Sequence, residues 1–550
     1  MEKQVVDGVL FTDMLRAGAA NLCAYAQAIN NLNVFPIPDG DTGDNMVLTI
    51  MGGVNALGVE NPSVSEVAKQ AADGMLLSAR GNSGVILSQL FAGIAEGLEG
   101  LKDADTMQLG NALQCGVRHA YNAVIEPTEG TILTVAKNAA NYTESRVSNS
   151  VEEFIGDYLT EARRTLERTP DMLPVLKRAG VVDSGGAGLV YIVEGAAKAL
   201  SGEMELPELH SYKFQDTHDV NINLFTEDSI LEYGYCTELL LRLQRSKTDT
   251  EHFDVTIIAD YLKKIGDSVV AFKTGSIIKI HVHTMTPDKV LRYCQKYGEF
   301  LKVKIENMSL QHNNTMLDRI KITASPESER KAYGVVAVCA GEGIKQMFLD
   351  RGADQIVDGG QSMNPSTQDF LEAFRKINAE TILVLPNNGN VILSAQQAAK
   401  IYPGADVRVI ESKTIGDGYT ALSMLNPAVD NVNEMIDDME CAMQGVITAE
   451  VSQCVRDANI LDAQVHSGDY IGFAGKEILA ASNDRLDAVC ATVDRLGPAG
   501  YDICILICGS APSEEEAERA EAYIRFHYPD KEIYRIDGKQ EIYDYILILE

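Results

Sequence analysis

The stretch Phe35-Pro36-Ile37-Pro38-Asp39-Gly40-Asp41-Thr42-Gly43-Asp44-Asn45-Met46 places three carboxylates and two glycines in a turn that leads into an apolar run. The two prolines keep the incoming chain extended, because the residue before a proline is disfavoured in a helix. Thr42 is the expected N-cap of the helix that follows, with Asp44 and Asn45 in its first turn. Asp39 and Asp41 lie two residues apart on the extended segment and can therefore point the same way.

Converging carboxylates repel one another at pH 7 unless a cation joins them, and hard oxygen ligands favour Mg²⁺. An EF-hand calcium loop does not fit, because its glycine position holds Asp44 and its closing glutamate position holds Ile50. An ordinary solvated Asp-Gly turn does fit this stretch taken alone. The stretch therefore suggests a metal site and leaves the simple turn open.

Three further glycine-centred turns occur in the first 200 residues, at 80–89, 127–135 and 182–189. In the first of them a Gly-Asn-Ser-Gly turn opens a helix, so that backbone N–H groups and a hydroxyl lie at the positive end of the helix dipole. Phosphate binds well in such a place. Each turn taken alone is also an ordinary helix cap. Four such turns in one helical region, one of them acidic, favour a nucleotide site.

These motifs together resemble the ATP-binding subunit of bacterial fatty acid kinase. The residues that carry the resemblance are Asn33-x-Phe35-Pro36-x-Pro38-Asp39-Gly40-Asp41-Thr42-Gly43-x-Asn45-Met46, Gly81-Asn82-Ser83-Gly84, Glu129-Gly130-Thr131 and Asp183-Ser184-Gly185-Gly186. The N-terminal part is also similar to the nucleotide-binding L subunit of dihydroxyacetone kinase. The resemblance extends to the closing Asp537-Gly538-Lys539-Gln540-x-x-Tyr543-x-Tyr545. It implies an all-α helical barrel that holds ATP and Mg²⁺ at one end.

The resemblance also implies which residues form that site. Asp39 and Asp41 match the metal-binding carboxylates and are the expected catalytic pair. The residues that match the nucleotide-binding segments are Thr42, Gly43, Asn45, Ser83, Gly84, Ser88, Gln89, Thr131 and Asp183. The family usually has threonine in place of Asp44, and Asn33 stands where the dihydroxyacetone enzymes have a further aspartate. Which of these two completes the metal shell stays open.

Composition and charge agree with a large enzyme. The 550 residues carry a net charge of −32, which argues against nucleic acid or an anionic membrane surface as a partner. We expect no signal peptide and no membrane insertion, because no apolar run approaches the roughly 18 residues that span a bilayer. The ten cysteines are scattered, often in apolar company as at Cys339, Cys504 and Cys508. Reduced thiols in the cytoplasm suit this pattern better than disulfides.

The chain changes character twice, which predicts a multidomain α and α/β fold. Residues 1–205 form the helical nucleotide-binding domain, 226–320 a middle α/β domain with a β-hairpin, and 331–550 a C-terminal α/β domain. By resemblance the last domain is similar to the fatty-acid carrier and docks that separate protein. Its polar loops at 358–366 and 386–390 follow buried strands, where open α/β sheets bind ligands, although ordinary connections fit equally.

The middle domain carries a possible metal set of its own. Residues 269–284 read as a hairpin, on whose second strand His281 and His283 share one face. Cys236, on another expected strand, would add a soft ligand, and three such ligands suit Zn²⁺. An exposed histidine pair fits the spacing as well, but the three residues resemble a zinc-binding set of the family's middle domain. Family analogy also suggests a homodimer through this domain, and leaves the role of His312 unassigned.

The predicted activity is transfer of a phosphoryl group from ATP to the carboxylate of a carrier-bound fatty acid. A P-loop enzyme is excluded, because no Gly-x₄-Gly-Lys-Ser/Thr motif occurs. One alternative is a kinase of the same fold that acts on a small hydroxyl compound such as dihydroxyacetone. The other is a non-catalytic scaffold that senses ATP and regulates a partner.

Overall fold

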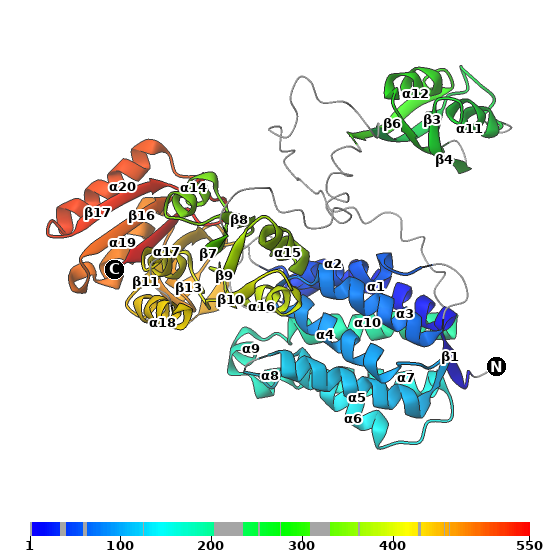
Figure 1. Cartoon of the computed structure of the whole chain (residues 1–550), viewed down its shortest axis with the longest axis horizontal. Coiled ribbons are helices and arrows are strands. Elements are labelled where there is room, and N and C mark those ends of the chain that lie inside the picture. Colours follow the sequence, from blue (N-terminus) through cyan, green and yellow to red (C-terminus); the bar gives the residue numbers. More distant parts are fainter. Residues whose placement is uncertain are drawn as a thin grey trace. The chain divides into compact units, whose positions relative to one another are not determined.

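The computed structural model divides the chain into two compact units, residues 1–211 with 329–550, and residues 212–328. Figure 1 shows their elements in chain colours. The described residues are 3–32, 40–58, 63–124, 126–202, 235–250, 253–274, 277–307, 330–360, 364–426, 431–455, 457–460 and 463–550.

The N-terminal part of the first unit is built from packed helices, as predicted (Figure 1). A short antiparallel pair, β1 (Val5–Asp7) with β2 (Asp103–Asp105), accompanies them. The core contains the fully buried side chains of Leu22, Met46 and Ile50. The helices are α1 (Gly8–Asn30), α2 (Thr42–Asn55), α3 (Val64–Ser78), α4 (Gly81–Gly97), α5 (Thr106–Ala123), α6 (Ile132–Glu144), α7 (Val151–Glu167), α8 (Thr169–Met172), α9 (Pro174–Ala179) and α10 (Ser184–Ser201).

An apolar cavity of about 130 Å³ lies among these helices, lined by residues such as Phe11, Phe91, Leu113 and Ile192. A cavity of roughly 150 Å³ with such a lining holds benzene. The described helices therefore leave an apolar space among them.

The C-terminal part of the first unit contains two sheets. The four strands of the first are all parallel, in the order β10-β9-β7-β8, and the second has the order β15-β14-β11-β18-β16-β17. The strands of the first sheet and the helices that connect or follow them are β7 (Lys331–Cys339), α14 (Glu342–Asp350), β8 (Gln355–Asp358), α15 (Thr367–Arg375), β9 (Ala379–Leu385), α16 (Ile392–Ile401), β10 (Asp406–Val409), α17 (Ile415–Ser423) and α18 (Val432–Met443). The second comprises β11 (Ile447–Gln453), β14 (Tyr470–Ala474), β15 (Glu477–Ser482), α19 (Arg485–Leu496), β16 (Ile503–Cys508), α20 (Glu514–His527), β17 (Glu532–Asp537) and β18 (Tyr545–Leu549), with a small hairpin of β12 (Ala458–Ile460) and β13 (Ala463–Val465).

The predicted α/β character of this part is confirmed. The buried runs at 335–339, 381–385 and 503–508 form β7, β9 and β16. One core joins the two sheets, because Leu385 of β9 and Ile507 of β16 belong to the same buried cluster. Cys339, Cys504 and Cys508 are buried free thiols, as expected.

The second unit is a four-stranded antiparallel sheet in the order β4-β5-β3-β6, with two helices. The predicted hairpin is confirmed, since β4 and β5 pair as neighbours. Buried side chains of the strands, such as Leu239 and Ile280, pack with Ile258 and Val290 of the helices. The elements are β3 (Tyr235–Leu243), α11 (Thr256–Leu262), β4 (Gly266–Thr274), β5 (Ile277–Thr284), α12 (Pro287–Cys294) and β6 (Gly298–Asn307).

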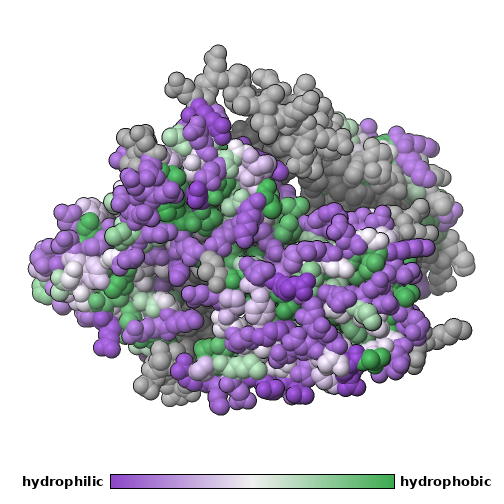
Figure 2. Space-filling model, turned by 60° about the horizontal axis from the view of Figure 1, so that its bottom comes forward, coloured by the Kyte–Doolittle hydropathy of each residue, from purple (hydrophilic) through white to green (hydrophobic). Residues whose placement is uncertain are grey.

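Hydrophilic residues predominate on the face shown in Figure 2, and hydrophobic ones form small separate groups there. This agrees with the net charge of −32. Of the helices that the structure describes, none has the length and apolar character needed to cross a membrane.

Candidate nucleotide and metal site

The acidic motif lies at the amino end of α2. Asp41 is the N-cap residue and Thr42 the first helical residue, so the predicted cap was wrong by one position. The Asp41 carbonyl accepts a hydrogen bond from the Asn45 N–H at 2.8 Å, which starts the helix. Its carboxylate makes no capping bond to α2 and accepts a hydrogen bond from Nδ2 of Asn364. The carboxylate thus faces away from its own helix.

Three helix amino ends meet at this point because glycines let their backbones approach. A Cβ on Gly84 of α4 would lie 2.4 Å from Thr49 Oγ1 of α2, and one on Gly188 of α10 would lie 2.5 Å from Met46 Sδ. The Ser184 hydroxyl of α10 also donates to Thr42 Oγ1 at 3.3 Å. Several positive helix ends beside one carboxylate suit a phosphate bridged to a cation.

Asp183 joins two of the motifs. As the N-cap of α10 its carboxylate accepts the Gly186 N–H at 2.7 Å, and it also accepts the backbone N–H of Ile132, the first residue of α6. Burial raises its pKa to about 6. This carboxylate fixes the amino ends of α6 and α10 to each other, and a contact with a nucleotide stays a prediction. Thr131, just before α6, donates its hydroxyl to the Thr128 carbonyl at 2.7 Å.

The predicted phosphate turn opens α4 as expected. Gly81 has φ of +57°, a left-handed conformation that favours glycine. The Ser83 hydroxyl is half-buried and makes no hydrogen bond within the described part of the chain. Ser88 is fully buried and donates to the Val85 carbonyl at 2.8 Å, whereas Gln89 donates to Gln397 at 3.1 Å. Ser83 therefore offers a donor to a ligand more directly than Ser88 does.

Asp44 points toward the end of α1. Its Oδ2 accepts a hydrogen bond from Asn30 Nδ2 at 2.9 Å, and Asn30 Oδ1 accepts the Gly43 N–H at 2.7 Å. Burial raises the pKa of the Asp44 carboxyl, which the Asn30 bond partly offsets. Asn30 thus orients the acidic motif. Sequence reasoning missed it, because it lies outside the motif at the last position of α1.

Two residues of the C-terminal domain also reach the site and were missed. Asn364 donates to the Asp41 carboxylate, and Asn390 accepts from Asn82 Nδ2 at 3.3 Å. Both lie in the polar loops after β8 and β9, which the sequence marked as a possible ligand-binding edge without connecting them to the nucleotide site.

The donors present fit Mg²⁺ with a nucleotide. Asp41 supplies a carboxylate, Ser83 a hydroxyl, and the helix ends supply N–H groups to phosphate oxygens. Asp39 and Asn33 lie outside the described residues, as does His312. Whether Asn33 or Asp44 completes the metal shell therefore stays a prediction.

The middle-domain residues are described by backbone register alone. Antiparallel pairing sets Cys236 of β3 opposite His283 of β5, and Glu238 opposite His281. The three predicted zinc ligands thus occupy neighbouring positions on two adjacent strands. A second group of potential ligands, Glu96, Cys115 and His119, lies on α4 and α5 with ligand atoms within 4.8 Å of one another. His119 Nε2 is 2.7 Å from Glu96 Oε2, so an ordinary hydrogen bond accounts for part of it.

Sequence comparison matches three successive regions to known domains. Residues 36–198 match the DAK2 domain, 232–315 the FakA-like middle domain of fatty acid kinase, and 334–550 the FakA-like C-terminal domain. Protein YloV of Bacillus subtilis is 38% identical over 562 aligned positions, which cover 100% of both chains. An uncharacterised protein of Staphylococcus epidermidis is 37% identical over 99% of both chains. This chain belongs to the FakA-like family of fatty acid kinase proteins.

Two solved structures resemble parts of this FakA-like chain. The fatty acid kinase B3 protein of Streptococcus pneumoniae, loaded with linoleic acid, covers 40% of this chain and 99% of its own at 16% identity and a TM-score of 0.29. The dihydroxyacetone kinase of C. freundii, in complex with AMP-PNP and Mg²⁺, covers 36% of this chain and 35% of its own at 19% identity and a TM-score of 0.28.

Proposed function

We propose that this chain is the ATP-binding subunit of a fatty acid kinase. It transfers the γ-phosphoryl group of ATP to the carboxylate of a fatty acid held by a separate carrier protein, giving an acyl phosphate and ADP. The observation that carries the proposal is the meeting of the amino ends of α2, α4 and α10 beside Asp41. Membership of the family supports the choice of a fatty acid as the acceptor.

The chemistry asks the protein mainly for positioning and charge neutralisation. A fatty acid carboxylate is ionised at pH 7, so it attacks phosphorus without a general base while the bond from phosphorus to the ADP oxygen breaks. Asp39 and Asp41 would hold Mg²⁺, which supplies neutralisation of the phosphate charge when bound. The Ser83 hydroxyl and the N–H groups of α2 and α4 would donate to phosphate oxygens.

A separate carrier would hold the acyl chain, as membership of the family suggests. A long acyl chain exposed to water would be costly, at roughly 0.8 kcal/mol for each CH₂ group. A partner that encloses the chain and presents only the carboxylate removes this cost.

The middle domain is proposed to bind Zn²⁺ through Cys236, His281 and His283. The β3–β5 register supports this set, since it pairs Cys236 with His283 and leaves His281 two positions along the same strand. One cysteine and two histidines leave a fourth position of tetrahedral Zn²⁺ for water or another group. Metal analysis of the purified chain and of a Cys236→Ala variant tests the assignment.

A homodimer through the middle domain is also proposed. β6 is an edge strand, and its apolar residues Leu301, Val303 and Ile305 are 39–49% exposed. Such a row on an edge strand favours pairing with another chain. We also propose a cytoplasmic location, which agrees with the free thiols of the nine cysteines whose side chains the structure describes.

The test is ATP consumption by the purified full chain with Mg²⁺ and a fatty-acid-loaded carrier from the same organism. Turnover that requires carrier, lipid and Asp41 supports the proposal. Turnover with dihydroxyacetone in place of the carrier supports the small-hydroxyl kinase instead. ATP binding without phosphoryl transfer to either acceptor would support a sensing scaffold and contradict the proposal.

A further inference from the structure

The loop after β8 of the C-terminal domain is fixed against the turn that opens α4. Ser366 and Arg80 form an antiparallel β-bridge, and the Thr367 N–H donates to the Ala79 carbonyl at 3.2 Å. Arg80 Nη1 donates to the Asn364 carbonyl at 2.9 Å, and Arg80 Nη2 lies 3.8 Å from Asp369. The backbone of residues 364–367 is therefore fixed to Ala79 and Arg80, directly before the predicted phosphate turn.

The Asn364 side chain lies between the two halves of the nucleotide site. It is 2% exposed, and its Nδ2 donates to Asp41 Oδ2 at the amino end of α2. The same Nδ2 lies 3.1 Å from where a Cβ of Gly81 would be, at the amino end of α4. A residue from the C-terminal domain thus sits between the metal carboxylate and the phosphate turn.

Two amide oxygens at this place have no hydrogen-bond partner in the described part of the chain. They are Oδ1 of Asn364 and Oδ1 of Asn82, and both are buried. Leaving a buried acceptor unpaired is costly, so such oxygens usually have a partner such as a water or an ion. Amide oxygens next to a carboxylate are ligands for a hard divalent cation or for the water that surrounds it.

Asn82, whose Oδ1 is the second unpaired oxygen, also lies where the C-terminal domain contacts the start of α4. Its Nδ2 donates to Asn390 Oδ1, on the loop after β9 of the C-terminal domain. Both unpaired oxygens therefore lie where loops of the parallel sheet meet the amino ends of the kinase helices.

We propose that Asn364 is a residue of the Mg²⁺–nucleotide site, supplied by the C-terminal domain. The inference rests on the proposed function, because it takes Asp41 as the metal carboxylate. The C-terminal domain would then be part of the nucleotide site. The contacts of this domain with the start of α4 would therefore influence the affinity for Mg²⁺–ATP. If the Asn364 amide only occupied the place of the cation, it would compete with Mg²⁺, and its removal would strengthen Mg²⁺–nucleotide binding.

The test is the affinity of the full chain for the non-hydrolysable analogue AMP-PNP, measured by calorimetry with excess Mg²⁺ and with EDTA. Asn364→Ala is expected to weaken binding about tenfold with Mg²⁺ and to leave binding in EDTA unchanged. Asn433→Ala, the same change at an exposed position of α18, is the matched control and should bind like the wild type. Equal or tighter binding by Asn364→Ala would overturn the inference.

Asn364→Asp provides a second readout that keeps the shape of the side chain. A second carboxylate beside Asp41 is expected to lower several-fold the Mg²⁺ concentration that gives half-maximal AMP-PNP binding. An unchanged Mg²⁺ requirement would overturn the inference, even where Asn364→Ala fails to fold. Asp41→Ala separates the two proposals. If Asp41→Ala binds AMP-PNP like the wild type in Mg²⁺, the proposed nucleotide site itself is wrong. If Asp41→Ala loses AMP-PNP binding while Asn364→Ala binds normally, only the inference about Asn364 is wrong.

Discussion

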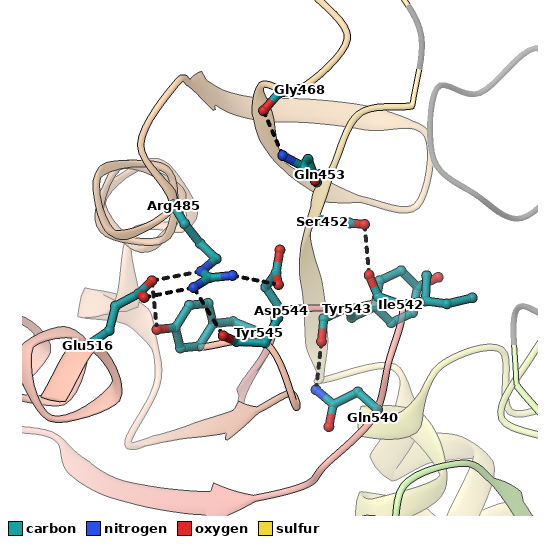
Figure 3. Close-up of polar contacts among 11 residues, drawn as sticks. Ser452, Gln453, Gly468, Arg485, Glu516, Gln540, Ile542, Tyr543, Asp544 and Tyr545 are labelled. Atoms are coloured by element: carbon teal, nitrogen blue, oxygen red, sulfur yellow. Dashed lines mark hydrogen bonds and ion pairs between the residues drawn. The ribbon is translucent and has the colours of Figure 1, made fainter. Parts of the chain in front are cut away.

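The Asp41 site and the polar cluster around Arg485 use similar side chains and differ in how fully the chain satisfies them. In Figure 3 Arg485 lies between Glu516 and Asp544. Its Nε and Nη2 each donate to Glu516 at 2.8 Å, and its Nη1 donates to Asp544 at 3.2 Å. Tyr545 adds a hydrogen bond to Glu516 at 3.4 Å. At the Asp41 site, by contrast, two buried amide oxygens lack partners in the described chain.

The two clusters therefore have different tasks. Arg485 lowers the pKa of Glu516, while burial outweighs the arginine at Asp544 and raises the pKa of that carboxyl. The cluster ties α19 and α20 to β18 and needs no ligand. The Asp41 site, within the described residues, keeps buried amide oxygens that the chain leaves unpaired. Buried groups without partners, more than charge alone, therefore mark the place where a ligand is expected.

The largest expected effect separates the clusters by activity. Asp41→Ala should lower Mg²⁺-dependent turnover by about 100-fold or more, since it removes a carboxylate from the proposed metal site. It should leave the thermal midpoint within a few degrees of the wild type. Steady-state kinetics and a circular dichroism melt measure the two quantities. A large fall in the midpoint would show that Asp41 is a structural residue.

The next effect separates them by stability. Arg485→Met leaves the buried Asp544 and the half-buried Glu516 without their cation and should cost about 3 kcal/mol of unfolding free energy. AMP-PNP affinity should not change. Arg408→Met removes an exposed pair with Asp406 and is the matched control, with an expected cost below about 1 kcal/mol. Denaturant unfolding measures both variants, and equal losses would contradict the contrast between the clusters.

A smaller effect is expected from a substitution in the predicted phosphate turn. Gly81→Ala should cost about 1–2 kcal/mol for its φ of +57° and should also weaken AMP-PNP binding, because the new Cβ would lie 2.6 Å from Asn45 Nδ2. Gly100→Ala is the matched control, with φ of +76° and no atom within 4 Å of the new Cβ. It should show the strain alone. Unchanged binding by Gly81→Ala would argue against a nucleotide at this turn.

The smallest effect concerns Glu450, a buried carboxyl of β11 without a cation partner in the described residues. Burial, and then the charge of Asp417, raise its pKa to about 8. Because the folded-state pKa lies above the ordinary value of 4.5, the folded protein holds the proton between these values, and this group lowers stability as pH rises through that window. Glu450→Gln should therefore raise the thermal midpoint by a few degrees at pH 8 relative to the wild type, and by less at pH 5.

Melts at the two pH values check this prediction. Glu477→Gln, at an exposed position of β15, controls for the loss of one negative charge and should leave the pH dependence as in the wild type. If Glu450→Gln shows the same pH dependence as the wild type, the raised pKa of Glu450 is wrong.

Local patterns predicted much of the fold. The apolar stripe after Gly81 predicted α4, and continuous apolar runs predicted β7, β9 and β16. These elements were predictable because the spacing of apolar residues along the chain indicates which side chains are buried. The cap of α2 was misplaced by one residue, since Asp and Thr are both good caps and the choice between Asp41 and Thr42 depends on what else binds the side chain.

The parts that could not be predicted depend on contacts between distant residues. Asn364 meets Asp41 across 323 positions, and no local pattern encodes that pairing. Asp183 looked like a nucleotide ligand from its motif, while its carboxylate accepts two backbone N–H groups of the protein. The motifs picked out residues that the structure brings close together, such as Thr42 and Ser184, but a motif does not show which of its residues would touch a ligand and which hold the helices in place.

Phosphorylation of the fatty acid carboxylate can be tested by trapping the product with neutral hydroxylamine. The full chain is incubated with Mg²⁺, ATP and the fatty-acid-loaded carrier, and an acyl phosphate then forms a fatty acyl hydroxamate, whereas a phosphate ester does not. The account predicts hydroxamate in proportion to the ADP released, and none with Asp41→Ala. Release of ADP without hydroxamate would contradict phosphorylation of the carboxylate.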